Sequence, residues 1–144
     1  MENIRFIMGV KMFKYYAFKT SLKRVEYNFN LPESGGMIDI AVVDRISNIE
    51  IKSDEVEFNA SRQLNFANLN GSALFVEFKV SVKVNGEINK DDFISDFKAD
   101  SNRNIFGTAI FSRISQVISN ITGCSAIGPI ITTANFDVNN IEIE

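Results

Sequence analysis

Carboxylates are the side chains of this chain best suited to chemistry, because the usual catalytic nucleophile pairs cannot form. The 144-residue sequence has no histidine and one cysteine, Cys124. This excludes Ser-His-Asp and Cys-His sites, as well as histidine-bearing metal sites. The acidic residues that could form a carboxylate or Mg²⁺ site are Asp54-Glu55, Asp91-Asp92, Asp96 and Asp100. We interpret them as solvated turn and edge residues, so the sequence predicts a protein that is not an enzyme and has no cofactor or metal.

Composition places the chain among ordinary globular domains. Hydrophobic residues make up 45% and charged residues 23%, which predicts one domain over residues 1–144. The net charge of −3, without a dense Lys/Arg cluster, argues against nucleic-acid binding. The apolar run Phe6–Val10 is too short for a signal peptide, and no stretch is long enough to span a membrane. We therefore expect a cytoplasmic protein, in keeping with its single cysteine.

The first two-thirds of the sequence has the period-two pattern of strands. The strongest run is Leu74–Val84, in which six apolar residues alternate with polar ones and so share one face. Asn85-Gly86 follows it, a pair that favours a tight hairpin, so a return strand is expected through Ile88 to Phe97. The other strand candidates are Phe13–Phe18, Leu22–Phe29, Met37–Val43, Ile49–Ile51 and Val56–Phe58.

Near the C-terminus the apolar spacing changes to that of a helix. Gly123 follows this segment, where a left-handed C′ residue would be wanted, and the opposite face is polar with one charge. That face is a candidate for packing against another subunit. The helical stripe consists of Ile110, Phe111, Ile114, Val117, Ile118 and Ile121. The fold class is therefore α+β: an antiparallel sheet of about four strands with a long amphipathic helix on one face. An extended segment, residues 127–138, is expected to lie back over the domain.

Aromatic residues are the remaining candidates for function. The chain has thirteen phenylalanines and no tryptophan. Loops or partner subunits could cover them, or some could line an apolar groove, because exposed apolar patches usually mark interaction sites. The candidate peptide-binding residues are Phe66, Leu69, Phe75, Phe93 and Phe97.

The order of elements and one short motif resemble the SecB-type export chaperones. The motif runs from Asn104-Ile105-Phe106 through the striped helix to Gly128-Pro129-Ile130-Ile131 and on to Asn135-Phe136-Asp137. The resemblance covers residues 13–138 in element order and 104–137 in residues. It implies a homotetramer, a dimer of dimers with the helix between sheets of neighbouring subunits. The residues expected at that oligomer interface are Phe111, Ile114, Ser115 and Ile118.

The resemblance also implies an ATP-independent holdase. Its apolar grooves would bind unfolded or nascent polypeptides, or one dedicated client, with little sequence specificity. The chain departs from the export members, since it ends soon after Phe136, without a second C-terminal helix and motor-binding tail. Coupling to a Sec motor is therefore left open. The alternative is a small oligomeric structural or assembly protein, such as a phage-encoded component, without chaperone activity.

Overall fold

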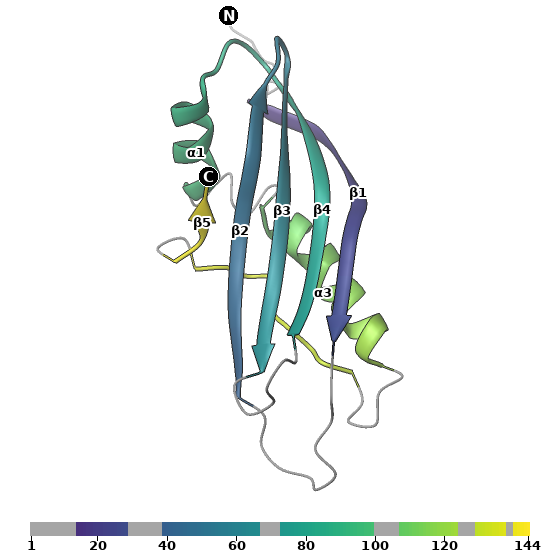
Figure 1. Ribbon diagram of the computed structural model, residues 1–144. Coiled ribbons are helices and arrows are strands. Elements are labelled where there is room, and N and C mark those ends of the chain that lie inside the picture. The colour runs from purple at the N-terminus through teal and green to yellow at the C-terminus, as the bar shows by residue number, and fades with distance from the viewer. Residues whose placement is uncertain (1–13, 29–38, 67–72, 100–106, 124–128, 138–139) are drawn as a thin grey trace, which may run out of the picture.

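The computed structural model describes residues 14–28, 39–66, 73–99, 107–123, 129–137 and 140–144. Cys124, Asp100, Leu69 and Asn104–Phe106 lie outside these ranges. A long sheet carries two helices (Figure 1). The elements in chain order are β1 (Tyr15–Asn28), β2 (Ile40–Ile51), β3 (Glu55–Phe66), β4 (Ala73–Val84), α1 (Lys90–Lys98), α3 (Thr108–Thr122) and β5 (Glu142–Ile143).

The sheet has the strand order β1-β4-β3-β2-β5. Its four long strands pair antiparallel, as the sequence predicts. The short β5 pairs parallel to β2 at Arg45 and Ile46 only, so the sheet is mixed and not purely antiparallel. The α+β class is confirmed, whereas the prediction of a wholly antiparallel sheet is wrong by this one strand.

Two of the long strands continue through positions where the sequence indicates a break. In β1 the register with β4 shifts twice, and Ala17 has a φ of 50°. In β2 the register with β3 shifts after Ser47, where Asn48 has a φ of 54°. Bulges absorb an extra residue and bend the strand without ending it. Each pair of short predicted strands is therefore one longer, bent strand, which Figure 1 shows clearly for β1.

The predicted return strand after β4 is wrong, because this segment forms helix α1. Gly86 has a positive φ of 93°, but Asn85 does not, so the chain does not form a type I′ turn. Asn89 then caps the helix: its Oδ1 accepts a hydrogen bond from the Asp92 N–H at 2.8 Å. Asp91 and Asp92 lie in the first turn, where negative charge is favourable.

Helix α3 confirms the helical stripe and spans 15 residues. Gly123 has a φ of −60°, so the prediction of a left-handed C′ glycine is wrong. Thr122 provides hydrogen bonds at the C-terminal end of the helix instead. Its hydroxyl donates to Ile118 O at 2.7 Å and accepts from the Ile130 N–H at 2.7 Å. The second bond directs residues 129–137 back along the helix, as the sequence predicts. We call this extended segment the strap.

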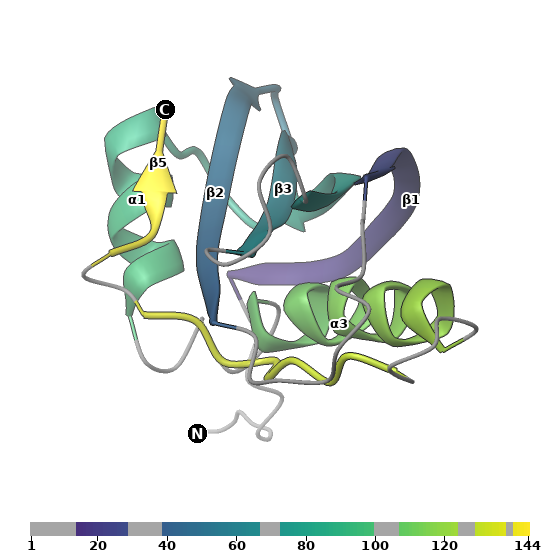
Figure 2. The ribbon, with the colours of Figure 1, turned by 60° about the horizontal axis from the view of Figure 1, so that its bottom comes forward.

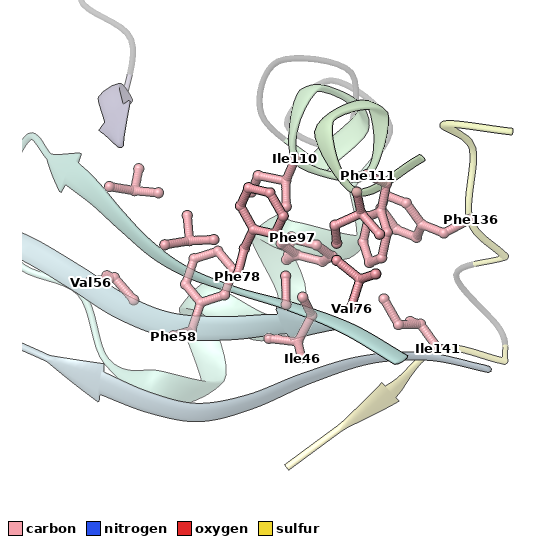
Figure 3. Packing of buried hydrophobic residues seen from close by; sticks show 14 of the residues in the cluster. Ile46, Val56, Phe58, Val76, Phe78, Phe97, Ile110, Phe111, Phe136 and Ile141 are labelled. Atoms are coloured by element: carbon pink, nitrogen blue, oxygen red, sulfur yellow. The ribbon is translucent and has the colours of Figure 1, made fainter. Parts of the chain in front are cut away.

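Both helices cover the same face of the sheet, which we call the inner face (Figure 2). The rings of Phe93 and Phe97 of α1 pack against Phe58 of β3, at ring-centroid distances of 5.2 and 6.1 Å. Phe136 of the strap joins the helices, lying 5.3 Å from Phe97 and 4.9 Å from Phe111 (Figure 3). The opposite, outer face carries no helix in the described part of the chain.

A buried tyrosine connects β1 to α1 and predicts a pH dependence of stability. The Tyr15 hydroxyl donates to Asp96 Oδ2 at 2.5 Å. Burial, and then this carboxylate, raise the pKa of Tyr15 above its ordinary value of 10.0. The folded state therefore holds its proton at pH values where the unfolded state has lost it. The resulting stability is complete below about pH 10 and is lost as pH rises through the folded pKa.

We therefore expect the free energy of unfolding to fall more steeply above about pH 10 in the parent than in Tyr15→Phe, by up to about 1.4 kcal/mol per pH unit. Urea unfolding at a series of alkaline pH values measures this difference. Tyr16→Phe, at an exposed neighbouring position, is the matched control and should keep the parent slope. Identical slopes in the parent and Tyr15→Phe would contradict the assignment.

Candidate functional site

A groove lies between the strap and the part of β2 that extends beyond its pairing with β5. Its volume is about 350 Å³, and it is lined by inner-face side chains of β2 and by most of residues 130–137. Ile40 and Val42 form the β2 wall, and Ile130 and Ile131 belong to the strap wall. The groove therefore joins two segments that lie about ninety residues apart in the sequence.

The walls of this groove are apolar and in contact with solvent. Ile40 is 38% exposed, Val42 48% and Ile131 76%. On β3 and β4, the inner-face residues at the same level are covered: Leu64, which pairs with Val42, and Leu74, which pairs with Leu64, are fully buried. The sheet thus extends past the segments that cover its inner face, and leaves apolar side chains open along β2.

Within the described residues, part of the β2 backbone beside the groove is not paired with another strand. The Glu144 N–H donates to Ile46 O at 3.0 Å, so the backbone groups of Ile46 point away from β3, toward β5. The register from Ile40 to Ser47 is regular, and backbone direction repeats every second residue. The groups of Ile40 and Val42 therefore point to the same edge, beyond the part of β2 that pairs with β5.

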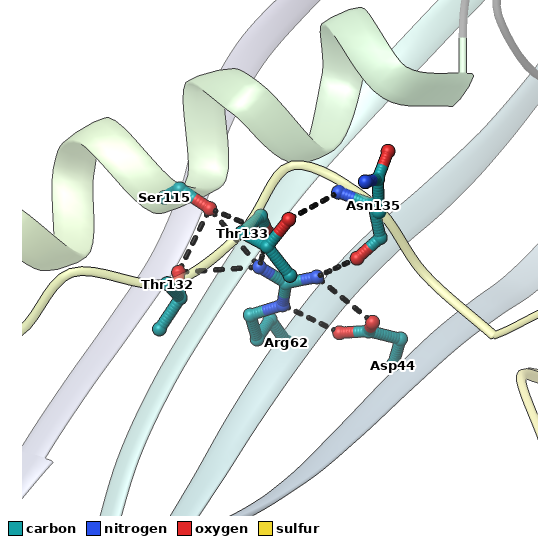
Figure 4. Close-up of polar contacts among 6 residues, drawn as sticks. All are labelled: Asp44, Arg62, Ser115, Thr132, Thr133 and Asn135. Carbon is teal, nitrogen blue, oxygen red and sulfur yellow. Dashed lines mark hydrogen bonds and ion pairs between the residues drawn. The ribbon is translucent and has the colours of Figure 1, made fainter.

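A buried arginine forms the floor of the groove and connects its two walls (Figure 4). Arg62 of β3 is 1% exposed. It forms a bidentate ion pair with Asp44 of β2, from Nε to Oδ1 at 2.7 Å and from Nη2 to Oδ2 at 2.9 Å. The same guanidinium donates from Nη1 to Thr132 Oγ1 at 3.2 Å and from Nη2 to Asn135 O at 3.2 Å.

Helix α3 is bound into the same network. Arg62 Nη1 also donates to Thr133 O and to Ser115 Oγ, the latter at 3.0 Å. The Thr132 hydroxyl donates to Ser115 Oγ at 2.8 Å. The Arg62 guanidinium lies 5.1 Å from the centroid of the Phe111 ring, within the range of a cation–π contact. One side chain therefore holds β2, α3 and the strap together.

The predicted peptide-binding residues do not gather at one place. Phe93 and Phe97 are fully buried in the core, and Phe66 is 4% exposed. Phe75 lies on the outer face with the Arg24 guanidinium 4.6 Å from its ring centroid, and Leu69 lies outside the described residues. Only Phe66 adjoins the groove, because it pairs with Ile40 across β2 and β3.

The predicted interface residues of α3 face the core of their own subunit. Phe111, Ile114 and Ile118 are fully buried, so in this conformation they present no surface to a second subunit. Ser115 is half-buried and hydrogen-bonded within the Arg62 network. An interface on this helix would have to use its outward polar side chains. The tetramer remains a prediction.

The groove residues Ile40, Val42, Ile131 and Arg62 were not singled out in the sequence. Arg62 carries a usable signal: it occupies an inner-face position in the alternating run Val56–Phe66, between Ala60 and Leu64. A charged residue at an apolar position of a strand requires buried partners. The exposure of Ile40 and Val42 has no comparable signal.

The candidate carboxylates form no site in the described part of the chain. Asp96 is bound by the Tyr15 hydroxyl and by Lys14 Nζ at 2.8 Å, and Asp91 and Asp92 lie at the start of α1. The described residues include no group of three or more acidic or cysteine side chains placed to hold a metal ion. Their helices also include none with the length and apolar character needed to cross a membrane.

Comparison with known proteins identifies the class of fold. No family model and no curated protein matches the chain. Among solved structures, the Mycobacterium tuberculosis SecB-like chaperone Rv1957, in complex with a ChAD peptide from the Rv1956 HigA1 antitoxin, matches with a TM-score of 0.58 and 14% identity. The match covers 85% of this chain and 88% of Rv1957. The fold is therefore SecB-like.

A second solved structure is a protein of unknown function from Streptococcus agalactiae. It matches with a TM-score of 0.40 and 11% identity, over 84% of this chain and all of that protein.

Proposed function

We propose that this chain is a SecB-like chaperone that holds an extended polypeptide in the groove between β2 and the strap. The observation that carries the proposal is the exposed apolar wall, Ile40, Val42 and Ile131, beside an open strand edge. The SecB-like fold supports it, and so does the antitoxin peptide bound to Rv1957. Binding would need no ATP and no cofactor.

Addition of a strand is the binding mode that best suits this geometry. A client segment beside β2 would pair with the backbone groups of Ile40 and Val42. Alternate side chains of the client would then point into the groove, against Val42 and Ile131. Backbone pairing would give affinity without sequence specificity, whereas the apolar groove would select segments with alternating apolar residues.

The first test is a Val42→Asp substitution. Burial of a valine side chain contributes about 1.5–3 kcal/mol, and a carboxylate in its place would be desolvated by the client. We expect the affinity for a fluorescent extended peptide of alternating valine and lysine to fall at least ~10-fold. Fluorescence anisotropy measures the affinity. Suppression of the aggregation of reduced, denatured lysozyme should weaken in parallel.

Leu22→Asp is the matched control, because Leu22 is 53% exposed on the inner face of β1, at the opposite edge of the sheet. It makes the same change of charge on a comparable side chain and should retain binding. A parent protein that neither binds the peptide nor slows aggregation would rule out the chaperone proposal, and the assembly-protein alternative would then be preferred. Equal losses in both variants would place the client elsewhere.

A further inference from the structure

The strap is attached to the domain in two different ways along its length. Its ends are held by apolar and backbone contacts: Phe136 is 8% exposed in the core, and the Ile130 N–H is bonded to Thr122. Between them, none of residues 131–135 is buried, and Ile131 is 76% exposed. All hydrogen bonds from residues 131–135 to other described elements go to Arg62 or Ser115.

We propose that Arg62 is a positioning residue that sets the shape of the groove, so that client affinity depends on a side chain the client does not touch. This inference rests on the proposed function. Arg62 is 1% exposed beneath the groove, and it acts through Asp44 on one wall and through the strap carbonyls on the other. Figure 4 shows both sets of contacts radiating from one guanidinium.

Arginine suits this position because its guanidinium is planar and donates in fixed directions. The Nε and Nη2 atoms point to the Asp44 carboxylate, while Nη1 and the second proton of Nη2 point to the strap. The distance between the walls is therefore fixed by one rigid group. A lysine at this position would keep the charge opposite Asp44, but it could not donate in both directions with the same geometry.

The expected consequence is a preorganised groove. With Arg62 in place, the strap wall is already ordered before a client arrives, and Ile131 stands opposite Val42 without further cost. Without Arg62, residues 131–135 would sample other conformations between their fixed ends. The apparent affinity would then fall in proportion to the fraction of molecules whose groove is intact.

The test is the double substitution Arg62→Met/Asp44→Leu. It removes both members of the ion pair, so that no unpaired charge is left buried and the inner face stays apolar. We expect the alternating valine–lysine peptide to bind at least ~10-fold more weakly. We also expect faster hydrogen–deuterium exchange in residues 131–135 of the free protein. Exchange in β3 and β4 should stay at the parent level, which a general loss of structure would not allow.

The matched control is Lys52→Met/Glu57→Leu, which removes a different ion pair. Its Lys52 Nζ and Glu57 Oε1 atoms are 3.0 Å apart, and neither residue lines the groove. It should retain both affinity and strap protection. Arg62→Lys is the second variant and serves if the double variant does not fold; it should show the same two changes in milder form. Parent-like affinity and exchange in the Arg62 variants would overturn the inference.

Failure of the proposed function would give a different result. If the parent binds no peptide, the chaperone proposal is lost, and the proposed effect of Arg62 on affinity is lost with it. The exchange measurement on the free protein would still decide whether Arg62 orders the strap. If the parent and the control bind and the folded Arg62 variants bind equally well, only the positioning role is overturned.

Discussion

Replacement of Phe97 by alanine is expected to lower the free energy of unfolding by about 3–5 kcal/mol. Phe97 is fully buried, and its ring contacts Phe58 of β3, Phe93 of α1 and Phe136 of the strap. It therefore joins three segments in one aromatic cluster. Truncation would remove these contacts and leave a cavity that the sheet cannot fill by relaxation.

Urea unfolding followed by far-UV circular dichroism measures this loss, since the chain has no tryptophan. Phe75→Ala is the matched control: its ring lies on the outer face and is only partly buried, so we expect a loss of about 1 kcal/mol. The comparison also tests the first interpretation of Phe97 as a peptide-binding residue. A Phe97→Ala variant of parent stability with impaired peptide binding would restore that interpretation.

The sequence was sufficient to locate the elements that have a long, regular pattern. Six alternating residues in β4 and about three turns of apolar spacing in α3 indicate which face is buried, so both elements were predicted. Helix α1 was missed although its signals are present. Phe93 and Phe97 have helical spacing, and Asn89 precedes two acidic residues. The Asn-Gly pair favoured a hairpin, and nine residues give too short a pattern to outweigh it.

The groove could not be predicted from the sequence for a different physical reason. Ile40 and Val42 have the same alternation as the buried residues of β3, because a pattern shows which face is apolar but not what covers it. Their exposure depends on where the strap leaves the sheet. That position is set by the local hydrogen bond between Thr122 and Ile130, and by bonds from Arg62 to strap residues about seventy positions away in the sequence. Three of the phenylalanines predicted as ligand contacts, Phe66, Phe93 and Phe97, are instead buried in the core.

Arg62 gives the second large effect. Its substitution by methionine alone is expected to lower the free energy of unfolding by about 3–5 kcal/mol. The Asp44 carboxylate is 10% exposed and paired with Arg62, so it would remain largely buried without its counter-charge. The carbonyl oxygen of Asn135 would lose its donor as well, and that of Thr133 would keep only the Ser115 hydroxyl. Burial of unpaired polar groups, rather than loss of packing volume, is the cause of this destabilisation.

The double variant Arg62→Met/Asp44→Leu separates that cause from the positioning role. Replacement of a whole buried ion pair by apolar residues is often close to neutral, so its stability should lie within about 1–2 kcal/mol of the parent. Urea unfolding of the parent, both single variants and the double variant completes the cycle. A double variant as unstable as Arg62→Met would show that the strap contacts, and not the orphaned carboxylate, carry the loss. Recovered stability with weakened peptide binding is the expected result, because the ion pair then shapes the groove without being needed for the fold.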